Sequence, residues 1–115
     1  MGNDRDLLRG NIPTLILAIV KEGPTHGLAI AREINLRSNN TLELKQGTLY
    51  PALHALERDG WISGTWEILD GERPRKNYTL TAEGIVELGR RMQAWHVFSA
   101  AMENVTRTRS DEQTA

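Results

Sequence analysis

The sequence of 115 residues contains no cysteine. Without thiols, neither a disulfide framework nor a cysteine-ligated metal site can form, and nothing favours an oxidising compartment. The first residues lack the cationic and apolar segments of a signal peptide. No apolar run approaches the roughly 20 residues that a membrane-spanning helix needs. We therefore expect a cytoplasmic protein, with a chain length suited to one compact domain.

Groups that carry catalysis are also scarce. The chain has three histidines, which are far apart in the sequence and lack metal-ligand spacing: His26, His54 and His96. No glycine-rich phosphate loop and no nucleophile motif occurs. Glu57 and Asp59 flank Arg58, a mixture of charges that is typical of a solvated, partly paired surface. We expect no enzyme activity, no cofactor and no metal site.

Positive charge is not in excess, because 14 basic and 15 acidic residues give a formal net charge of −1. This balance argues against a protein that binds nucleic acid through an excess of positive charge over its whole surface. Any affinity for DNA must come from a local surface, and the acidic residues must lie elsewhere.

The segment 6–21 is rich in aliphatic residues around most of its circumference. This pattern predicts a helix at the centre of the core. Pro13 would be costly inside a helix and is tolerated in a first turn, so we expect the regular helix to begin near Ile12.

A second, shorter helix should follow the Gly23-Pro24 break. Thr25 is a good N-cap for it, and the pattern of apolar residues extends to about Arg37. The segment 41–45 could then add a short edge strand before the next helix.

The segment 46–59 predicts a two-faced helix that Gly60 ends. One stripe is apolar, with residues at i, i+3, i+4 and i+7: Leu49, Ala52, Leu53 and Leu56. The opposite face carries small, hydrogen-bonding and cationic side chains: Gln46, Gly47, Thr48, Tyr50, Pro51, His54 and Arg58. Such a face suits a helix that enters a DNA major groove.

A β-hairpin is predicted after this helix. The segments 61–69 and 78–80 favour strands, and the segment 70–76 between them contains turn residues. Arg73, Arg75 and Lys76 would give the hairpin positive charge for phosphate contacts, which position a protein on DNA without reading its sequence. The order helix, helix, helix, hairpin, helix predicts a mainly α fold with a small β-hairpin, a winged helix-turn-helix.

The last helix should run from 82 to 105, with Thr81 as its N-cap. Its apolar positions have coiled-coil spacing, and we expect them to form a dimer interface: Ile85, Leu88, Met92, Trp95, Ser99 and Met102. The alternative is that this stripe packs on the chain's own core. The expected division is a DNA-binding domain (1–80), a dimerisation helix (81–105) and a flexible tail (106–115).

Trp95 has two interpretations. It is an aromatic anchor of the dimer interface, a common use of tryptophan. Alternatively, with Phe98 and Ser99, it lines a slot in which a flat aromatic ligand stacks. The residues alone leave both open.

Several motifs occur in one order along the chain: HG at His26 and Gly27, GTLYPALHALERDGWI from Gly47 to Ile62, RKNY from Arg75 to Tyr78, and LTAEG ending at Gly84. In this order they resemble the PadR-like family of transcriptional regulators, in its short subfamily with a single C-terminal helix. The resemblance covers nearly the whole chain. Asn77 departs from it, because the family often has an aromatic residue at that place.

The resemblance implies a homodimeric repressor that binds an inverted-repeat operator and responds to a ligand. Trp95 looks like the tryptophan that stacks planar drugs in the multidrug-responsive branch. The residues expected at the DNA are Thr25, His26, Lys45, Gln46, Gly47, Thr48, Tyr50, Pro51, His54, Arg58, Arg73, Arg75, Lys76 and Tyr78. A winged-helix module that binds a protein instead of DNA is the competing hypothesis.

Overall fold

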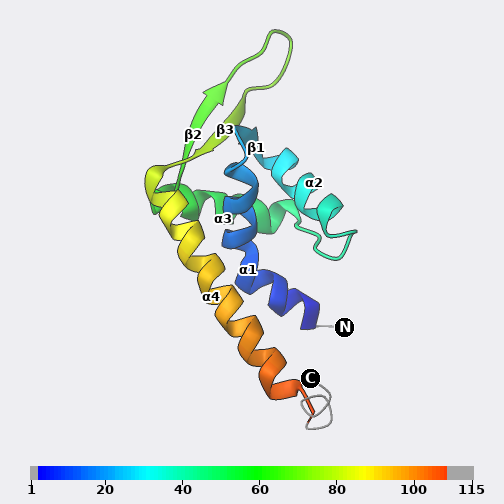
Figure 1. The fold of residues 1–115 in the computed structure, drawn as a ribbon. Coiled ribbons are helices and arrows are strands. Elements are labelled where there is room, and N and C mark those ends of the chain that lie inside the picture. Colours follow the sequence, from blue (N-terminus) through cyan, green and yellow to red (C-terminus); the bar gives the residue numbers. More distant parts are fainter. Residues whose placement is uncertain (1–2, 109–115) are drawn as a thin grey trace.

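The computed structural model describes residues 3–108, and in this range four helices accompany a three-stranded antiparallel sheet (Figure 1). In chain order the elements are α1 (Asn3–Val20), β1 (Thr25–His26), α2 (Gly27–Arg37), α3 (Gln46–Arg58), β2 (Ile62–Glu67), β3 (Arg75–Leu80) and α4 (Ala82–Thr106). The predicted winged helix with a long C-terminal helix is confirmed. The predicted tail 106–115 lies, from residue 109 onward, outside the described residues.

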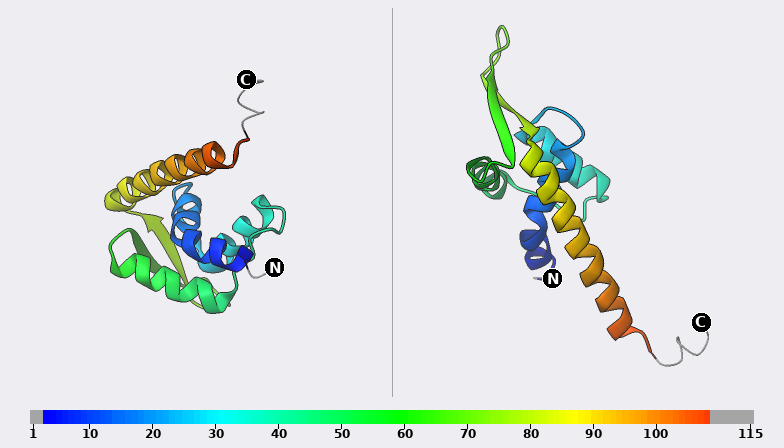
Figure 2. Two further views of the ribbon diagram at one scale, coloured as in Figure 1. Left: turned by 90° about the horizontal axis from the view of Figure 1, so that it is seen from below. Right: turned by 60° about the vertical axis from the view of Figure 1, so that its left-hand side comes forward.

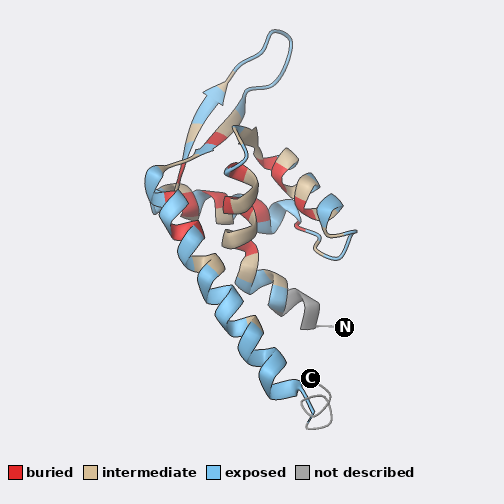
Figure 3. Ribbon diagram, viewed as in Figure 1, coloured by how far each residue is buried: buried red, intermediate tan, exposed pale blue. Residues whose placement is uncertain are grey.

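The core forms where one face of each helix meets the others. Its most deeply buried side chains include Ile16 and Leu17 of α1, Ile30 of α2, and Leu49 and Leu53 of α3. The helical spacing of these residues is what places them on inward faces. Figure 3 shows that the buried positions gather where the helices meet, whereas the later turns of α4 are exposed.

The sheet has the order β1-β3-β2, and the long hairpin β2–β3 forms the wing that projects from the helices (Figure 1). Its third strand comes from Thr25 and His26, which pair with Tyr78 and Asn77. Thr25 is therefore not the N-cap of α2. His26 takes that position with extended backbone and no side-chain cap bond. The predicted strand at 41–45 is wrong, because that segment is a loop and β1 occupies the edge of the sheet beside β3.

The first helix corrects a second expectation. α1 begins at Asn3 and continues through Pro13, instead of starting near Ile12. Figure 1 shows the α1 ribbon changing direction along its length, as expected where a proline removes one helical hydrogen bond. Interior proline costs about 3 kcal/mol. Burial of Ile16 and Leu17 stabilises the helix by about 1.5–3 kcal/mol each, so packing outweighs local preference.

α4 is attached to the core through its first turns. The Thr81 hydroxyl oxygen accepts the Gly84 N–H at 2.9 Å, which confirms the predicted N-cap, and the hydroxyl donates to the Gly60 carbonyl at 2.7 Å. A Cβ on Gly84 would lie 2.0 Å from the Trp61 carbonyl oxygen, so only glycine permits this close approach. Further along, α4 extends away from the other elements (Figure 2).

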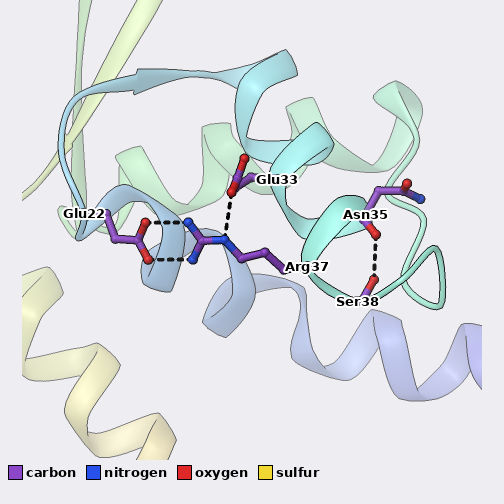
Figure 4. A network of polar contacts seen from close by, with 5 residues as sticks. All are labelled: Glu22, Glu33, Asn35, Arg37 and Ser38. Atoms are coloured by element: carbon purple, nitrogen blue, oxygen red, sulfur yellow. Dashed lines mark hydrogen bonds and ion pairs between the residues drawn. The ribbon is translucent and has the colours of Figure 1, made fainter.

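A charged cluster joins the end of α1 to the end of α2 (Figure 4). The Arg37 guanidinium donates two hydrogen bonds of 2.6 Å to Glu22 and a third of 2.8 Å to Glu33. The Ser38 hydroxyl donates to the Asn35 carbonyl close by. The side chains of Arg37, Glu22 and Glu33 are about half exposed, so water screens their attraction, while the paired hydrogen bonds between Arg37 and Glu22 fix the two helix ends relative to one another. Within residues 3–108, no helix combines the length and apolarity needed to cross a membrane.

Candidate nucleic-acid interface

α3 presents the two faces that its sequence predicts. Leu49, Leu53 and Leu56 are buried in the core. The opposite face is exposed at every predicted position: Gln46, Gly47, Thr48, Tyr50, Pro51, His54 and Arg58. The helix therefore offers hydrogen-bonding and cationic groups to solvent on a surface without aliphatic side chains.

A glycine at the start of α2 sets how closely that helix approaches α3. A Cβ on Gly27 would lie 3.0 Å from Cε1 of Tyr50 and 3.3 Å from Cδ1 of Leu53. Such contacts are tighter than side chains normally tolerate. The HG motif thus has a packing role, because Gly27 leaves room for the Tyr50 ring.

The start of α2, the exposed face of α3 and the wing enclose a hollow of about 420 Å³. Its lining includes His26, Tyr50, His54, Trp66, Arg75 and Lys76. The fold therefore brings together six of the residues predicted at the DNA, Tyr78 included, from three separate segments. Burial lowers the pKa of His26, and the nearby positive charges of Arg75 and Arg32 lower it further.

The wing carries less free positive charge than its sequence predicts. Lys76 Nζ lies 2.7 Å from Glu57 Oε1, and Arg75 Nη2 lies 3.3 Å from Glu67 Oε1. Among the residues that the structure describes, Arg73 forms no ion pair. Two of the three predicted phosphate ligands therefore already have carboxylate partners within the protein.

Two predicted site residues belong to the core. Tyr78 is only 2% exposed although it lines the hollow, so little of its surface is free for DNA, and its contact with DNA stays a prediction. Burial also raises the pKa of its hydroxyl. Leu88, predicted in the dimer interface, is buried among the chain's own core residues. The hydrophobic spacing along the sequence could not distinguish the buried Tyr78 and Leu88 from exposed residues. Positions of both kinds have apolar neighbours on the same face of their strand or helix.

The exposed apolar stripe of α4 is therefore displaced from the predicted one. Leu88 is buried and Met92 packs against the core, so the predicted alternative holds for the first part of the helix. Trp95 (44% exposed), Phe98 (56%), Met102 (50%) and Val105 (83%) remain uncovered further along. The turns from Trp95 onward thus present an unpartnered apolar surface.

Trp95 lies between two hollows where α1 and α4 face one another. The more apolar hollow has a volume of about 360 Å³ and is lined by Leu7, Leu8, Asn11, Thr14, Leu15, Leu42, Met92 and Trp95. The second is lined in part by Arg90, Arg91, Trp95 and Phe98. The Trp95 and Phe98 rings lie 6.4 Å apart and are tilted by 40°. Ser99, predicted beside them at a ligand, lines neither hollow.

Comparison with known proteins decides the family. The model of the "Transcriptional regulator PadR-like family" matches residues 16–90, which include α2, α3, the wing and the start of α4. The chain belongs to the PadR-like family of transcriptional regulators. The resemblance inferred from the motifs is thereby confirmed.

Individual relatives agree with this assignment. The transcriptional regulator Rv3488 of Mycobacterium tuberculosis is 32% identical over 80 residues, which cover 70% of this chain and 71% of the relative. A transcriptional regulator from Clostridium thermocellum superposes with a TM-score of 0.81 at 27% identity, covering 89% of this chain and 96% of that one.

One solved relative of this PadR-like chain is described as Bacillus subtilis PadR in complex with operator DNA. It has a TM-score of 0.65 and 26% identity, and the match covers 70% of this chain and 46% of that one. The two proteins therefore share the winged-helix core, and the relative has a large additional part.

Sequence reasoning missed three residues near this interface. The sequence placed Glu57 on a solvated, partly paired surface, whereas it is half-buried and its partner is Lys76 of the wing. Trp66 of β2 is 65% exposed and lines the hollow beside α3. Arg32 of α2 is exposed and close enough to His26 to influence its pKa. Trp66 is paired with Lys76 across the hairpin. Aligning the two predicted strands in this register would have placed Trp66 beside the basic residues of the wing.

Proposed function

We propose that this PadR-like protein is a homodimeric repressor, which binds an inverted-repeat operator and leaves it when a small effector binds. The exposed face of α3, polar and cationic along the helix, is the observation that carries the proposal. It stands beside a wing in a fold shared with a PadR solved on operator DNA. Such a face suits base-edge contacts in a major groove.

The proposed dimer places two α3 helices in successive major grooves, with half-sites about 10 base pairs apart. Arg73 and Arg75 of the wing and Lys45 at the start of α3 would contact flanking phosphates. All three side chains are exposed, and phosphate contacts of this kind fix register without specifying sequence.

The proposed dimer contact is the stripe from Trp95 to Val105 on α4. These turns expose large apolar side chains on an isolated chain, and such a patch is characteristic of an interface. A two-fold symmetric pair is the simplest arrangement that covers it. Sedimentation equilibrium at micromolar concentration tests this point, and a monomer at that concentration would contradict it.

Trp95 is the proposed effector residue, with planar aromatic compounds as ligands. It lies between two hollows, one of them largely apolar, and Phe98 adds a second ring. Both hollows separate α1 from α4, so a ligand that fills them would change how α4 leaves the core. A change in the spacing of the two α3 helices then gives different operator affinities with and without ligand.

Fluorescence quenching tests the effector site. The variant with Trp61→Phe and Trp66→Phe leaves Trp95 as the single tryptophan. Planar aromatic compounds should quench it, and the same compounds should weaken operator binding by the wild-type protein. A broad panel without quenching would remove the ligand slot and leave Trp95 as an interface anchor.

A gel-shift assay with the DNA upstream of the gene tests the function as a whole. Binding should depend on the inverted repeat and fall steeply as salt rises. Absence of binding at low salt would favour the competing hypothesis of a protein-binding winged helix, for which the exposed Trp66, Ile68 and Leu69 of the wing would be the contact.

A further inference from the structure

Among the basic residues of the wing, Lys76 has the surroundings that least resemble those of a phosphate ligand. Its ammonium nitrogen donates to Glu57 Oε1 at 2.7 Å, and the other carboxylate oxygen accepts the Gly64 N–H at 3.3 Å. Glu57 lies in the last turn of α3, Gly64 in β2 and Lys76 in β3. One carboxylate thus joins the recognition helix to both strands of the wing.

A glycine in the neighbouring strand leaves room for the observed path of the lysine side chain. A Cβ on Gly64 would lie 2.4 Å from Lys76 Cε and 3.1 Å from Glu57 Oε2. The ammonium also lies 5.8 Å from the centre of the Trp66 ring and 5.9 Å from that of Tyr78, within the range of cation–π attraction. Packing on two sides therefore holds the side chain on a course that leads to Glu57.

The protonation behaviour of the pair agrees with this geometry. The hydrogen bond from Lys76 is the main cause that lowers the pKa of Glu57, and the hydrogen bond to Glu57 is the main cause that raises the pKa of Lys76. Both side chains are less than a third exposed. The two groups are therefore charged together over the physiological pH range.

We infer that Glu57, Gly64 and Lys76 form a latch that fixes the wing against α3, and that Lys76 is a positioning residue instead of a phosphate ligand. The inference rests on the proposed DNA-binding function, because it concerns how two DNA-contacting elements are held at one separation. Only the residues Asp59 to Trp61 connect α3 to β2, and they lie at the base of the wing. The latch acts further out, at Gly64, the third residue of β2, and at Lys76, the second residue of β3. Fixing the wing before DNA arrives reduces the ordering cost of binding.

The two roles of Lys76 predict opposite results for Glu57→Gln. If Lys76 contacts phosphate, this change strengthens binding, since it removes a negative charge near DNA and releases the ammonium. If Lys76 belongs to the latch, the change weakens binding about tenfold, the size expected for loss of a charged hydrogen bond.

A double-mutant cycle on operator affinity tests the coupling. Lys76→Met keeps most of the aliphatic chain and removes the charge, and it should also weaken binding about tenfold. The combined variant should be hardly weaker than either single variant, because each one already opens the latch. Gly64→Ala, whose methyl group occupies the path of Lys76, should give the same loss. Additive effects, or tighter binding by Glu57→Gln, would overturn the proposal.

Arg73→Ala is the matched control for charge, because Arg73 lies in the same wing and has no ion pair among the described residues. If its side chain neutralises one phosphate, this variant should reduce the slope of log affinity against log salt by about 0.9. Lys76→Met should leave that slope unchanged. A reduced slope for Lys76→Met would show that Lys76 contacts phosphate.

Hydrogen exchange on the DNA-free protein separates failure of the latch from failure of the proposed function. Amides of β2 and β3 should exchange faster in Lys76→Met and Glu57→Gln, and at wild-type rates in Arg73→Ala. Faster exchange in a protein that binds no DNA would refute the proposed function and keep the latch as a brace of the wing. Unchanged exchange in all three variants would refute the latch whatever the DNA result.

Discussion

The two parts of α4 differ in what surrounds them although they form one continuous helix. From Thr81 to Met92 the helix is anchored, with Gly84 against the Trp61 backbone and Leu88 in the core. From Trp95 to Thr106 it is exposed, including its large apolar side chains. The first part attaches the helix to the winged-helix core, and the second leaves apolar side chains uncovered, where the proposed dimer contact lies. A change in the angle between two such helices would therefore reach α3.

Substitutions in the exposed part of α4 should have the largest effect, and this effect should be on the affinity for DNA. Replacing Phe98 and Met102 by Glu places charge in the proposed dimer interface, so the pair should separate. Loss of two-site binding should lower operator affinity about 1000-fold, or roughly 4 kcal/mol. Gel shifts measure the affinity, and sedimentation measures the dimer.

Ala100→Glu is the matched control, because Ala100 is exposed about 200° around the helix from Phe98. It should leave dimer and affinity unchanged. Circular dichroism should show that all these variants keep the helical fold, since the substituted side chains contribute little to the core. A Phe98/Met102 variant that stays dimeric would place the interface elsewhere.

Substitutions in the anchored part of α4 should instead lower the stability of the protein. Gly84→Ala puts a methyl group 2.0 Å from the Trp61 carbonyl oxygen, so α4 must shift away from the core. We expect the free energy of unfolding to fall by about 3 kcal/mol, at the upper end for overpacking. Urea denaturation at one fixed protein concentration measures it.

Gly89→Ala lies in the same helix, and its Cβ would meet nothing within 4 Å. Because alanine favours helix, this control should be stabilised by about 0.5–1 kcal/mol. The opposite signs of the two changes would locate the close contact at Gly84. Equal changes in stability for Gly84→Ala and Gly89→Ala would mean that helix propensity alone explains both.

The N-cap gives a smaller effect. Thr81→Ala removes the oxygen that accepts the Gly84 N–H and the donor to the Gly60 carbonyl, so stability should fall by about 1 kcal/mol. Thr81→Ser keeps both bonds and should retain most of the stability. Thermal unfolding compares the three proteins, and equal losses for serine and alanine would point to the missing methyl group instead.

The weakest expected effect is on acid stability. Hydrogen bonds from Arg90, and then from Arg91, lower the pKa of Glu87 in the folded state, and this outweighs the opposing influence of burial. A lowered carboxyl pKa contributes stability above the unfolded value, near 4.5, and this contribution is lost as the pH falls through the folded value. Glu87→Gln should therefore unfold with a weaker pH dependence below about pH 4.5, and an identical dependence would exclude Glu87 as a source.

Much of the fold follows from local patterns. The stripe of α3 was predictable because Leu49, Leu53 and Leu56 recur at helical spacing, and Gly60 ends the helix with a positive φ of 82°. Thr81 was predictable as a cap for the same local reason. Thr25 was not, because an equally good cap residue entered a strand whose partner, Tyr78, lies more than 50 residues away.

The candidate site likewise has features that the sequence predicted and features that it did not. Exposure of the outward face of α3 follows from the burial of its other face, and sequence reasoning obtained it. The pairing of Lys76 with Glu57 depends on a strand register and on a turn that brings the wing back past the end of α3. The presence of three basic residues in a hairpin, Arg73, Arg75 and Lys76, does not indicate that carboxylates from other segments will pair with them.

The sequence by itself determined the helices and the wing, the two faces of α3 and the family, because periodicity, capping residues and motif order are local properties. The tertiary structure decided which cations remain free, which part of α4 is covered and where Trp95 lies relative to α1. Those outcomes depend on contacts between distant segments, and the free energy of such contacts is set by packing and charge in three dimensions.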